Sequence, residues 1–224
     1  MTEEKQATTK DRILDAAEHL FAQQGFDTSL RDITAAAGVN LAAVNYHFQS
    51  KDALVLAVFA RRVQPLNEKR LAKLEEFEAA AGGKPVALED LTRAFLSPML
   101  ELLKLRKGSD AARLVGRMFV EPGDLHERFF KQELAPVADR FRAALRRTLP
   151  DEPEVDLFWK FLFAAGVVGH TVAGLHKVKV ISGGLCDISD TQALLDRAVT
   201  FIAAGFRAPY QPPQKGEPSC NASR

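Results

Sequence analysis

The side chains whose types and spacing suit a chemical task gather between Thr28 and Lys51. Asn45 carries an amide that can both donate to and accept from an adenine edge, as Asn and Gln do in the major groove of DNA. Thr28, Ser29 and Arg31 offer two hydroxyls and a guanidinium, groups that commonly contact phosphate oxygens. This stretch therefore predicts hydrogen bonding to nucleic acid.

Enzymatic motifs are absent from the sequence. There is no Gly-x-Gly-x-x-Gly pattern, and Gly82-Gly83-Lys84 lacks the upstream glycine of a phosphate-binding loop. No Gly-x-Ser-x-Gly occurs. The five histidines form no His-Glu-x-x-His pattern, and the two cysteines are not spaced for zinc. We therefore expect no catalytic residue, no metal site and no cofactor.

Two short helices joined by a tight turn are expected to position the polar groups. Ser29 can cap the first helix, and Asp32 can return a hydrogen bond to the N–H of the cap. Gly38 follows the last periodic residue, at the position where a helix end favours left-handed backbone. The sequence thus predicts a first helix over about 30–37.

Asn40 can cap a second helix, Leu41–Phe48, whose inner face carries Val44 and Phe48. Two helices of this length around a glycine turn are typical of the helix-turn-helix, whose second helix enters the major groove of DNA. The opposite face of the second helix carries Asn45, Tyr46 and His47.

A specific combination of residues extends through 10–60. It consists of Arg12-Ile13-Leu14-Asp15-Ala16-Ala17, Leu20-Phe21, Gly25-Phe26, Thr28, Ile33, Ala36-Ala37-Gly38-Val39, Tyr46-His47-Phe48, Ser50-Lys51 and Leu54. With these residues the segment resembles the DNA-binding domain of the TetR/AcrR family of bacterial one-component repressors. The run from Gly38 to Phe48 resembles most closely the fatty-acid-responsive PsrA type within that family. A weaker similarity continues around Leu157-Phe158-Trp159-Lys160.

The resemblance implies roles for individual residues. Family positions that match Tyr46 and His47 commonly touch phosphates and bases, and the position that matches Lys51 reaches the DNA backbone. Leu41 and Ala43 stand where many relatives carry polar residues, so Leu41 could instead contact a thymine methyl. Half-buried packing for Tyr46 and a capping role for His47 are the alternatives. The predicted DNA-binding residues are Thr28, Ser29, Arg31, Asn40, Leu41, Ala43, Asn45, Tyr46, His47 and Lys51.

Length and composition are those of an ordinary globular protein. The chain has 224 residues, 46% of them hydrophobic and 26% charged, and is long enough to bury a sizeable core. Two cysteines cannot build a disulfide framework. The most continuous apolar run, Phe161–Gly169, is far shorter than the about 20 residues that span a bilayer. We expect a cytoplasmic protein without a membrane segment.

Charge argues against DNA binding. The formal net charge is only +1, and residues 10–52 include four basic and six acidic side chains. Asp11, Asp15 and Glu18 recur on one side of the first helix, where we expect a solvated stripe that faces away from DNA. Because phosphate neutralisation supplies most non-specific affinity, we expect weak non-specific binding, with specificity that depends on geometry and a dimer.

Periodicity and punctuation predict an all-α protein of about nine helices. Pro65 and Pro98 should bend their helices, and Pro136 should kink or split its helix. We expect a helix-turn-helix domain over 1–52, a helical ligand-binding and dimerisation domain over 53–208, and a disordered tail over 209–224. The expected helices cover about 10–24, 30–37, 41–48, 51–80, 88–105, 111–120, 125–148, 154–177 and 190–206.

Three of these elements carry further expectations. The charged second half of the helix over 51–80 is expected to be a solvated link between domains. The helix over 154–177 is apolar nearly all round and should be buried on more than one side. A loop over 178–188 should lead to a last helix that Ser189 and Gln192 cap.

Aromatic side chains and kinked helices in the C-terminal part predict a cavity. Small-molecule pockets are largely apolar and often lie between bundle helices, although core packing is the alternative for each single aromatic residue. Arg113 and Arg117 could hold an anionic headgroup, with a surface salt bridge as the alternative. The predicted ligand-binding residues are Phe95, Met99, Leu102, Arg113, Arg117, Phe130, Phe158, Phe161 and Phe163.

The sequence therefore predicts a homodimeric repressor. It would bind a palindromic operator in double-stranded DNA and leave it when a small apolar effector, a fatty acid or acyl-CoA, enters the C-terminal domain. A planar aromatic compound is the competing effector. A helical ligand-binding protein that no longer binds DNA is the rival function. The resemblance implies that the last two helices pair with their counterparts in a twofold dimer.

Overall fold

The protein is built from helices alone in the part that the structure describes. The computed structural model describes residues 8–105, 110, 114 and 124–210, and in them it has nine α-helices, one short π-helix and no strand. The predicted all-α class is therefore confirmed. Apart from Leu114, the predicted helix over 111–120 lies outside the described residues, as do residues 211–224 of the predicted tail.

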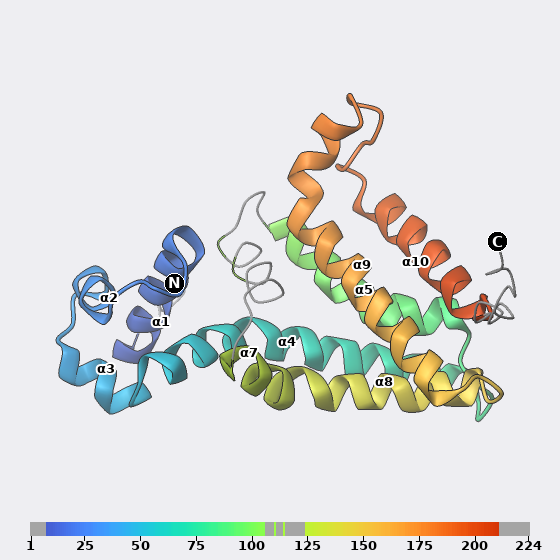
Figure 1. Ribbon diagram of the computed structural model, residues 1–224, viewed down its shortest axis with the longest axis horizontal. Coiled ribbons are helices and arrows are strands. Elements are labelled where there is room, and N and C mark those ends of the chain that lie inside the picture. The colour runs from blue at the N-terminus through green and yellow to red at the C-terminus, as the bar shows by residue number, and fades with distance from the viewer. Residues whose placement is uncertain (1–7, 106–109, 111–113, 115–123, 211–224) are drawn as a thin grey trace, which may run out of the picture.

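The helices form an elongated molecule (Figure 1). Helices α1 to α3 make one end, and α4 (Lys51–Ala80) runs from them along the molecule beside α7 and α8. Helices α5, α9 and α10 stack at the other end, where α5 packs against both α4 and α10. Among the described helices none is long and apolar enough to cross a membrane.

Side-chain caps fix the first three helices, α1 (Thr9–Gln24), α2 (Leu30–Ala37) and α3 (Leu41–Phe48). Each cap satisfies an N–H group that has no partner inside its helix. The predicted caps Ser29 and Asn40 are present, with one difference: the Asp32 carboxylate accepts from the hydroxyl of Ser29 and not from its N–H. The caps are Thr8, Ser29, Asn40 and, for α4, Ser50.

The turn between α2 and α3 is held from α1. Gly38 has a φ of 62°, in the left-handed region that glycine adopts without strain. Nη2 of Arg12 donates to the carbonyl oxygens of Ala37 and Gly38 at 2.6 and 2.8 Å. A Cβ on Gly38 would lie 2.8 Å from that nitrogen. The glycine therefore serves both the turn and the close approach of Arg12.

Helix α4 contributes to both hydrophobic cores. The first core joins α1, α2 and α3 to Leu54, Val58 and Phe59 of α4. The second core joins Leu66 and Leu74 of α4 to α5, α8, α9 and α10. The expectation of a solvated second half of α4 is wrong, because Leu66, Asn67, Arg70 and Leu74 are all buried.

Pro136 splits the predicted helix over 125–148, as expected. The chain forms α7 (Asp124–Phe129), a π-helix (Phe130–Leu134) and α8 (Ala135–Thr148). The N–H of Ala135 donates to the oxygen of Phe130, five residues earlier. Proline has no N–H and clashes with the preceding turn, so the wider turn ends directly before it. Pro98 lies inside α5 (Leu88–Leu105) and Pro65 inside α4.

The C-terminal helices differ from the prediction at their connection. Helix α9 (Glu154–Ile181) continues four residues beyond the expected end and stops where Gly183 and Gly184 take positive φ. Helix α10 (Thr191–Arg207) is capped by Asp190, which accepts from the N–H groups of Gln192 and Ala193. The Ser189 hydroxyl donates to Asp187 instead, so the predicted cap is one residue off.

A buried carboxylate ties α1 to α4. Glu18 is 5% exposed and accepts from Arg61 at 2.6 Å and from Arg62 at 2.8 Å. Arg61 also donates to Asp15 at 2.7 Å. The solvated acidic stripe expected on α1 is therefore wrong for Glu18, which is buried and paired with Arg61 and Arg62 of α4.

Removing this carboxylate should destabilise the protein. We expect Glu18→Ala to lower the free energy of unfolding by about 3 kcal/mol, because two guanidinium groups lose a buried partner. Glu127→Ala is the matched control, since Glu127 pairs with Lys131 in solvent and should change stability by less than about 0.5 kcal/mol. Urea unfolding followed by circular dichroism measures both. Equal stability of the two variants would contradict a structural role for Glu18.

Candidate nucleic-acid interface and ligand cavity

Helix α3 divides into a buried and an exposed face. Val44 and Phe48 are 1% and 5% exposed and hold the helix on the first core. Tyr46 is 83% exposed and Leu41 is 46% exposed, and Asn45 lies on the same open side. A helix with this division can enter a groove of DNA without losing its packing on the domain.

The other predicted DNA-binding residues lie around this face. Ser29 and Arg31 are exposed at the start of α2, and Lys51 is half-buried at the start of α4. Asn40 uses its side-chain oxygen to cap α3, with 2.9 Å to the N–H of Ala43, and its amide nitrogen stays available as a donor. The half-buried members of the set are Ala43 and His47, and the His47 ring meets the Tyr46 ring edge-on at 5.1 Å.

Thr28 does not lie on this surface. Its side chain is 6% exposed, and its hydroxyl donates to the carbonyl of Gly25 at 2.7 Å. The prediction of a phosphate contact by Thr28 is therefore corrected. The hydroxyl is used instead to close the turn between α1 and α2.

The acidic side chains of the first three helices have local partners. Hydrogen bonds from Thr8 lower the pKa of the Asp11 carboxyl. Asp15 and Glu18 pair with Arg61. The count over residues 10–52 omitted the arginines of α4 that lie beside these carboxylates. Their neutralisation removes much of the charge objection to a nucleic-acid interface.

A largely apolar cavity of ≈ 290 Å³ lies beside α4. Phe59, Val63, Leu66 and Asn67 form one wall from α4, and α5, α7, the π-helix, α8 and α9 contribute to the rest. Four predicted ligand-binding residues line the cavity: Phe95, Met99, Phe130 and Phe161. The opening of a cavity at the π-helix agrees with the wider turn directly before Pro136.

Two of the other predicted ligand-binding residues do not line this cavity. Phe158 and Phe163 are 50% and 63% exposed on the outside of α9, so their prediction as cavity residues is corrected. A helix that is apolar all round does not show from sequence which residues face the cavity. Arg113, Arg117 and the side chain of Leu102 lie outside the described residues.

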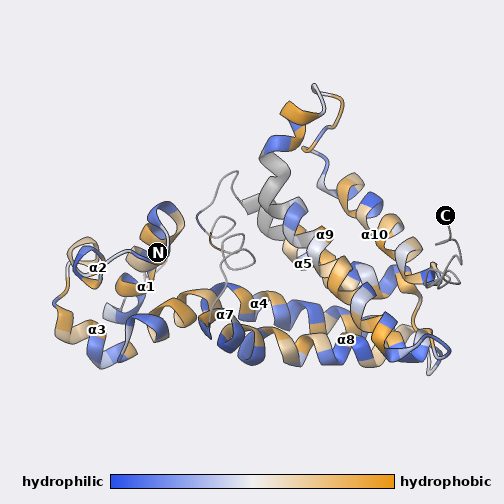
Figure 2. Cartoon of the chain, in the orientation of Figure 1, coloured by the Kyte–Doolittle hydropathy of each residue, from blue (hydrophilic) through white to orange (hydrophobic). Residues whose placement is uncertain are grey.

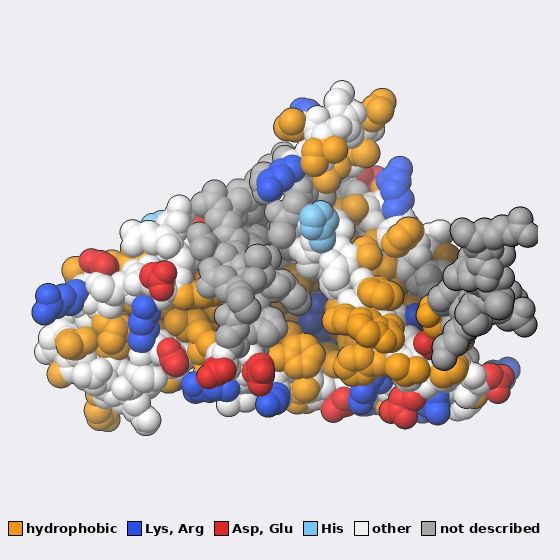
Figure 3. All heavy atoms as spheres, viewed as in Figure 1, with side chains coloured by type: hydrophobic (Ala, Val, Ile, Leu, Met, Phe, Trp, Pro, Cys, Tyr) orange, Lys and Arg blue, Asp and Glu red, His pale blue; other side chains and the backbone are white. Residues whose placement is uncertain are grey.

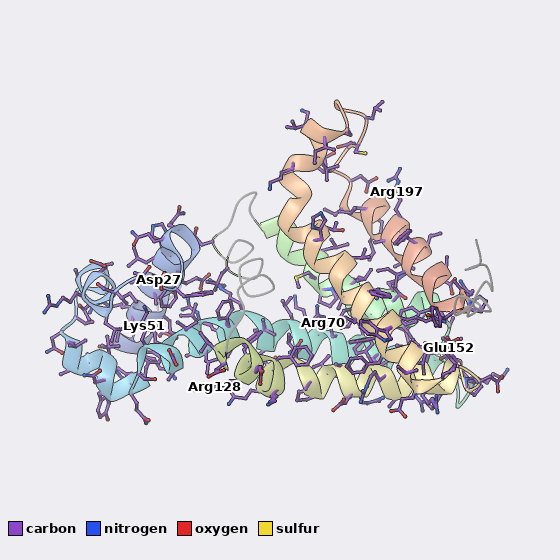
Figure 4. All side chains as sticks on the ribbon, in the orientation of Figure 1. Asp27, Lys51, Arg70, Arg128, Glu152 and Arg197 are labelled. Carbon is purple, nitrogen blue, oxygen red and sulfur yellow. The ribbon has the colours of Figure 1, made fainter. Side chains whose placement is uncertain are left out.

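The sequence analysis missed the most polar group of the cavity, Arg70. Its side chain is 4% exposed, and Figure 4 labels it on α4 beneath the stacked helices. Nε donates to the carbonyl of Phe95 at 2.9 Å, and Nη1 donates to Oδ1 of Asn67 at 3.0 Å. Burial lowers the pKa of Arg70 to about 10, so the guanidinium stays charged at neutral pH. The available signal was its position between Leu66 and Leu74, four residues from each.

An apolar face on α9 and α10 stays open to solvent. Hydrophobic residues line the lower part of α9 (Figure 2), and Figure 3 shows them as a cluster on the surface. Trp159 and Phe163, one turn apart, stack with ring centroids 5.8 Å apart. We call this surface the α9–α10 face and define it by Val155, Phe158, Trp159, Leu162, Phe163 and Phe201.

Metal chemistry finds no support in the described residues. Among them no three His, Cys, Asp or Glu side chains are close enough to hold an ion. The two features that stand out are therefore an exposed helix-turn-helix face and an apolar cavity, both attached to α4.

Comparison with protein families identifies the fold. Residues 13–58 match the family model described as bacterial regulatory proteins, tetR family. Residues 93–205, half of the chain, match the model of the tetracyclin repressor-like C-terminal domain. The chain belongs to the TetR family.

Individual relatives of this TetR-family protein are transcriptional regulators. It is 36% identical over 89 residues to the HTH-type transcriptional regulator AcrR of Shigella flexneri, covering 39% of each chain. It is 31% identical over 127 residues to SrpR of Pseudomonas putida, covering 56% of this chain and 59% of SrpR. These alignments span less than two thirds of either relative. They support a DNA-binding transcription regulator and no finer activity.

The whole fold also has a counterpart among solved structures. The fatty acid degradation regulator FadR from Bacillus halodurans superposes with a TM-score of 0.66 at 16% identity, over 92% of this chain and all of FadR. At this identity the likeness concerns the fold. It places the C-terminal helices of this TetR-family chain in the same arrangement as those of a regulator.

Proposed function

We propose that this TetR-family protein binds a palindromic operator as a homodimer and releases it when an apolar ligand fills the cavity beside α4. The observation that carries the proposal is that α4 contributes both to the core beneath the recognition helix and to the cavity wall. In this proposal residues 1–52 bind DNA, and residues 53–208 bind the ligand and the second subunit.

The exposed face of α3 supports the DNA part. Asn45 and Tyr46 are exposed at the centre of a helix that is fixed from behind by Val44 and Phe48. We propose that these two residues and Leu41 face the bases, and that Arg31, His47 and Lys51 face phosphates. Ser29, Asn40 and Ala43 then lie at the edges of the interface.

The α9–α10 face supports the dimer. Monomeric soluble proteins rarely expose a large cluster of apolar side chains, and such a cluster marks an interaction site. A twofold axis would set two copies of this face against each other and would bring two α3 helices about one DNA turn, roughly 34–36 Å, apart. Phe158 and Phe163 would then be buried in the interface.

The cavity supports an elongated apolar ligand, which we propose to be a fatty acid or a fatty acyl thioester. Its volume of ≈ 290 Å³ lies near the lower end of the range of small-molecule sites, which is about 300–1,000 Å³. Each buried methylene is worth about 0.8 kcal/mol before ordering costs. The resemblance of the recognition helix to the PsrA type and the fold shared with a fatty acid degradation regulator agree with this ligand class.

The first prediction concerns the recognition helix. Tyr46→Ala should weaken binding to an operator fragment about tenfold, equivalent to about 1.4 kcal/mol. Lys51→Ala should weaken it and reduce the salt slope by about one phosphate contact. Fluorescence anisotropy with DNA from upstream of the gene at several salt concentrations measures both effects.

Tyr210→Ala and Lys131→Ala change the same residue types on exposed surfaces elsewhere and should bind as the wild type does. Wild-type protein without operator affinity would favour the rival, a ligand-binding protein that has lost DNA binding.

The second prediction concerns assembly. Phe163→Glu should convert the dimer to a monomer, because a charge would be buried without a partner. Leu41→Glu places the same charge on an exposed leucine of α3 and should leave the dimer intact. Light scattering at micromolar concentration measures the mass. A stable wild-type monomer would exclude the proposed assembly.

The third prediction concerns the cavity. Ala138 lines it from α8 and is half-buried. Ala138→Leu should therefore fill part of the cavity and raise the oleate concentration that releases the operator. Ala72→Leu is the control, because Ala72 is exposed on α4 and does not line the cavity.

Titration of a planar aromatic compound in parallel separates the two effector classes. Release by the aromatic compound alone would replace the fatty acid by that class. Release by a polar metabolite alone would contradict a ligand role for the cavity.

A further inference from the structure

Arg70 carries a positive charge into the cavity, and no carboxylate in the described part of the chain pairs with it. The groups that it contacts in the described part of the chain are the Phe95 carbonyl, the Asn67 amide oxygen and the Phe95 ring. None of these is a carboxylate. Burial lowers its pKa, and among the described side chains no acidic group opposes that shift. Arg70 differs in this respect from Arg61, which has the carboxylates of Asp15 and Glu18 as partners.

A buried charge without a counter-charge is costly in free energy. A bound anion would supply the counter-charge. Arginine has five N–H donors, and the two hydrogen bonds use Nε and one hydrogen of Nη1. In the described part of the chain, Nη2 donates to no protein group. The structure therefore leaves a fork of donors for a partner in the cavity.

The neighbours of Arg70 hold the guanidinium in place. Nδ2 of Asn67 donates to the carbonyl of Glu133 at 2.6 Å, which fixes the amide whose oxygen accepts from Arg70. The Phe95 ring lies under the guanidinium, with 4.4 Å from its carbon to the ring centroid. Such a restrained fork loses little conformational freedom when it binds an anion.

The remaining cavity wall is apolar and suits a hydrocarbon chain. Met99, Phe130 and Phe161 line it together with Val63 and Gly166. A ligand that satisfies both parts has an apolar body and one terminal anion. Carboxylates match the geometry of a guanidinium with two parallel hydrogen bonds.

We infer that Arg70 binds the free carboxylate of a fatty acid whose chain occupies the apolar part of the cavity. This inference rests on the proposed function and narrows it, because a thioester, an ester or an alcohol of the same length brings no charge to Arg70. The ligand's headgroup decides between acid, ester and alcohol, and its hydrocarbon chain supplies most of the affinity.

A ligand series on the wild-type protein tests the inference first. Dodecanoate should bind about ten- to a hundredfold more tightly than methyl dodecanoate or dodecanol, as expected for hydrogen bonds between charged groups. Isothermal titration calorimetry measures the three affinities. Equal affinity of acid and ester would overturn the role of Arg70 and leave the cavity as the ligand site. No binding of any of the three would overturn both this inference and the proposed ligand class.

Variants then assign the effect to the residue. Arg70→Gln should bind acid and ester equally, and Arg70→Lys should keep part of the preference, because a single ammonium replaces the fork. Arg93→Gln is the control, since Arg93 pairs with Asp196 at the surface, and it should keep the full preference. A full preference for the acid in Arg70→Gln would overturn the assignment. If that variant fails to fold, the ligand series on the wild type decides alone.

Discussion

The rest of the structure depends on the packing of Phe59 at the middle of the molecule. Its ring lies 5.4 Å from that of Phe26, under the helix-turn-helix, and 5.3 Å from that of Phe129 in α7. The same side chain lines the ligand cavity. Because protein interiors are close-packed, a shift on one side of such a ring requires a shift on the other. The two functions of the chain therefore meet at one side chain rather than through a flexible linker.

Charge reinforces this connection. Glu18 binds Arg61 and Arg62, which lie two and three residues after Phe59 on α4, and Val63 of the cavity wall is the next residue. A ligand that moves this turn of α4 would therefore change both the ion pairs with Glu18 of α1 and the contact between the Phe59 and Phe26 rings. Useful allosteric coupling amounts to about 1–3 kcal/mol. Both connections lie within one helical turn, so a movement of that turn would rearrange them together and would contribute to that energy.

Local signals explain what the sequence predicted well. The caps Ser29, Asn40 and Ser50 and the turn at Gly38 act within three or four residues, and the observed helices α2, α3 and α4 begin where these signals lie. Long-range contacts explain the errors. The partners of Glu18 are more than 40 residues away in the sequence. In the sequence, Arg70 is one of several charged residues of its helix, and only the packing of α5 places the Phe95 carbonyl beside it. The surfaces of α9 were ambiguous because the helix is apolar all round, so its cavity side and its outer side have the same composition.

The length of α4 has a geometric consequence. Thirty residues of unbroken helix measure about 45 Å at 1.5 Å per residue. Only Gln49 and Ser50 separate α3 from α4, and Ser50 caps α4. Helix α3 must therefore move together with the start of α4. A tilt of α4 by about 5° around its far end would displace α3 by about 4 Å. In a twofold assembly both copies would move, and the separation of the two α3 helices would change by a sizeable part of the groove width of about 12 Å.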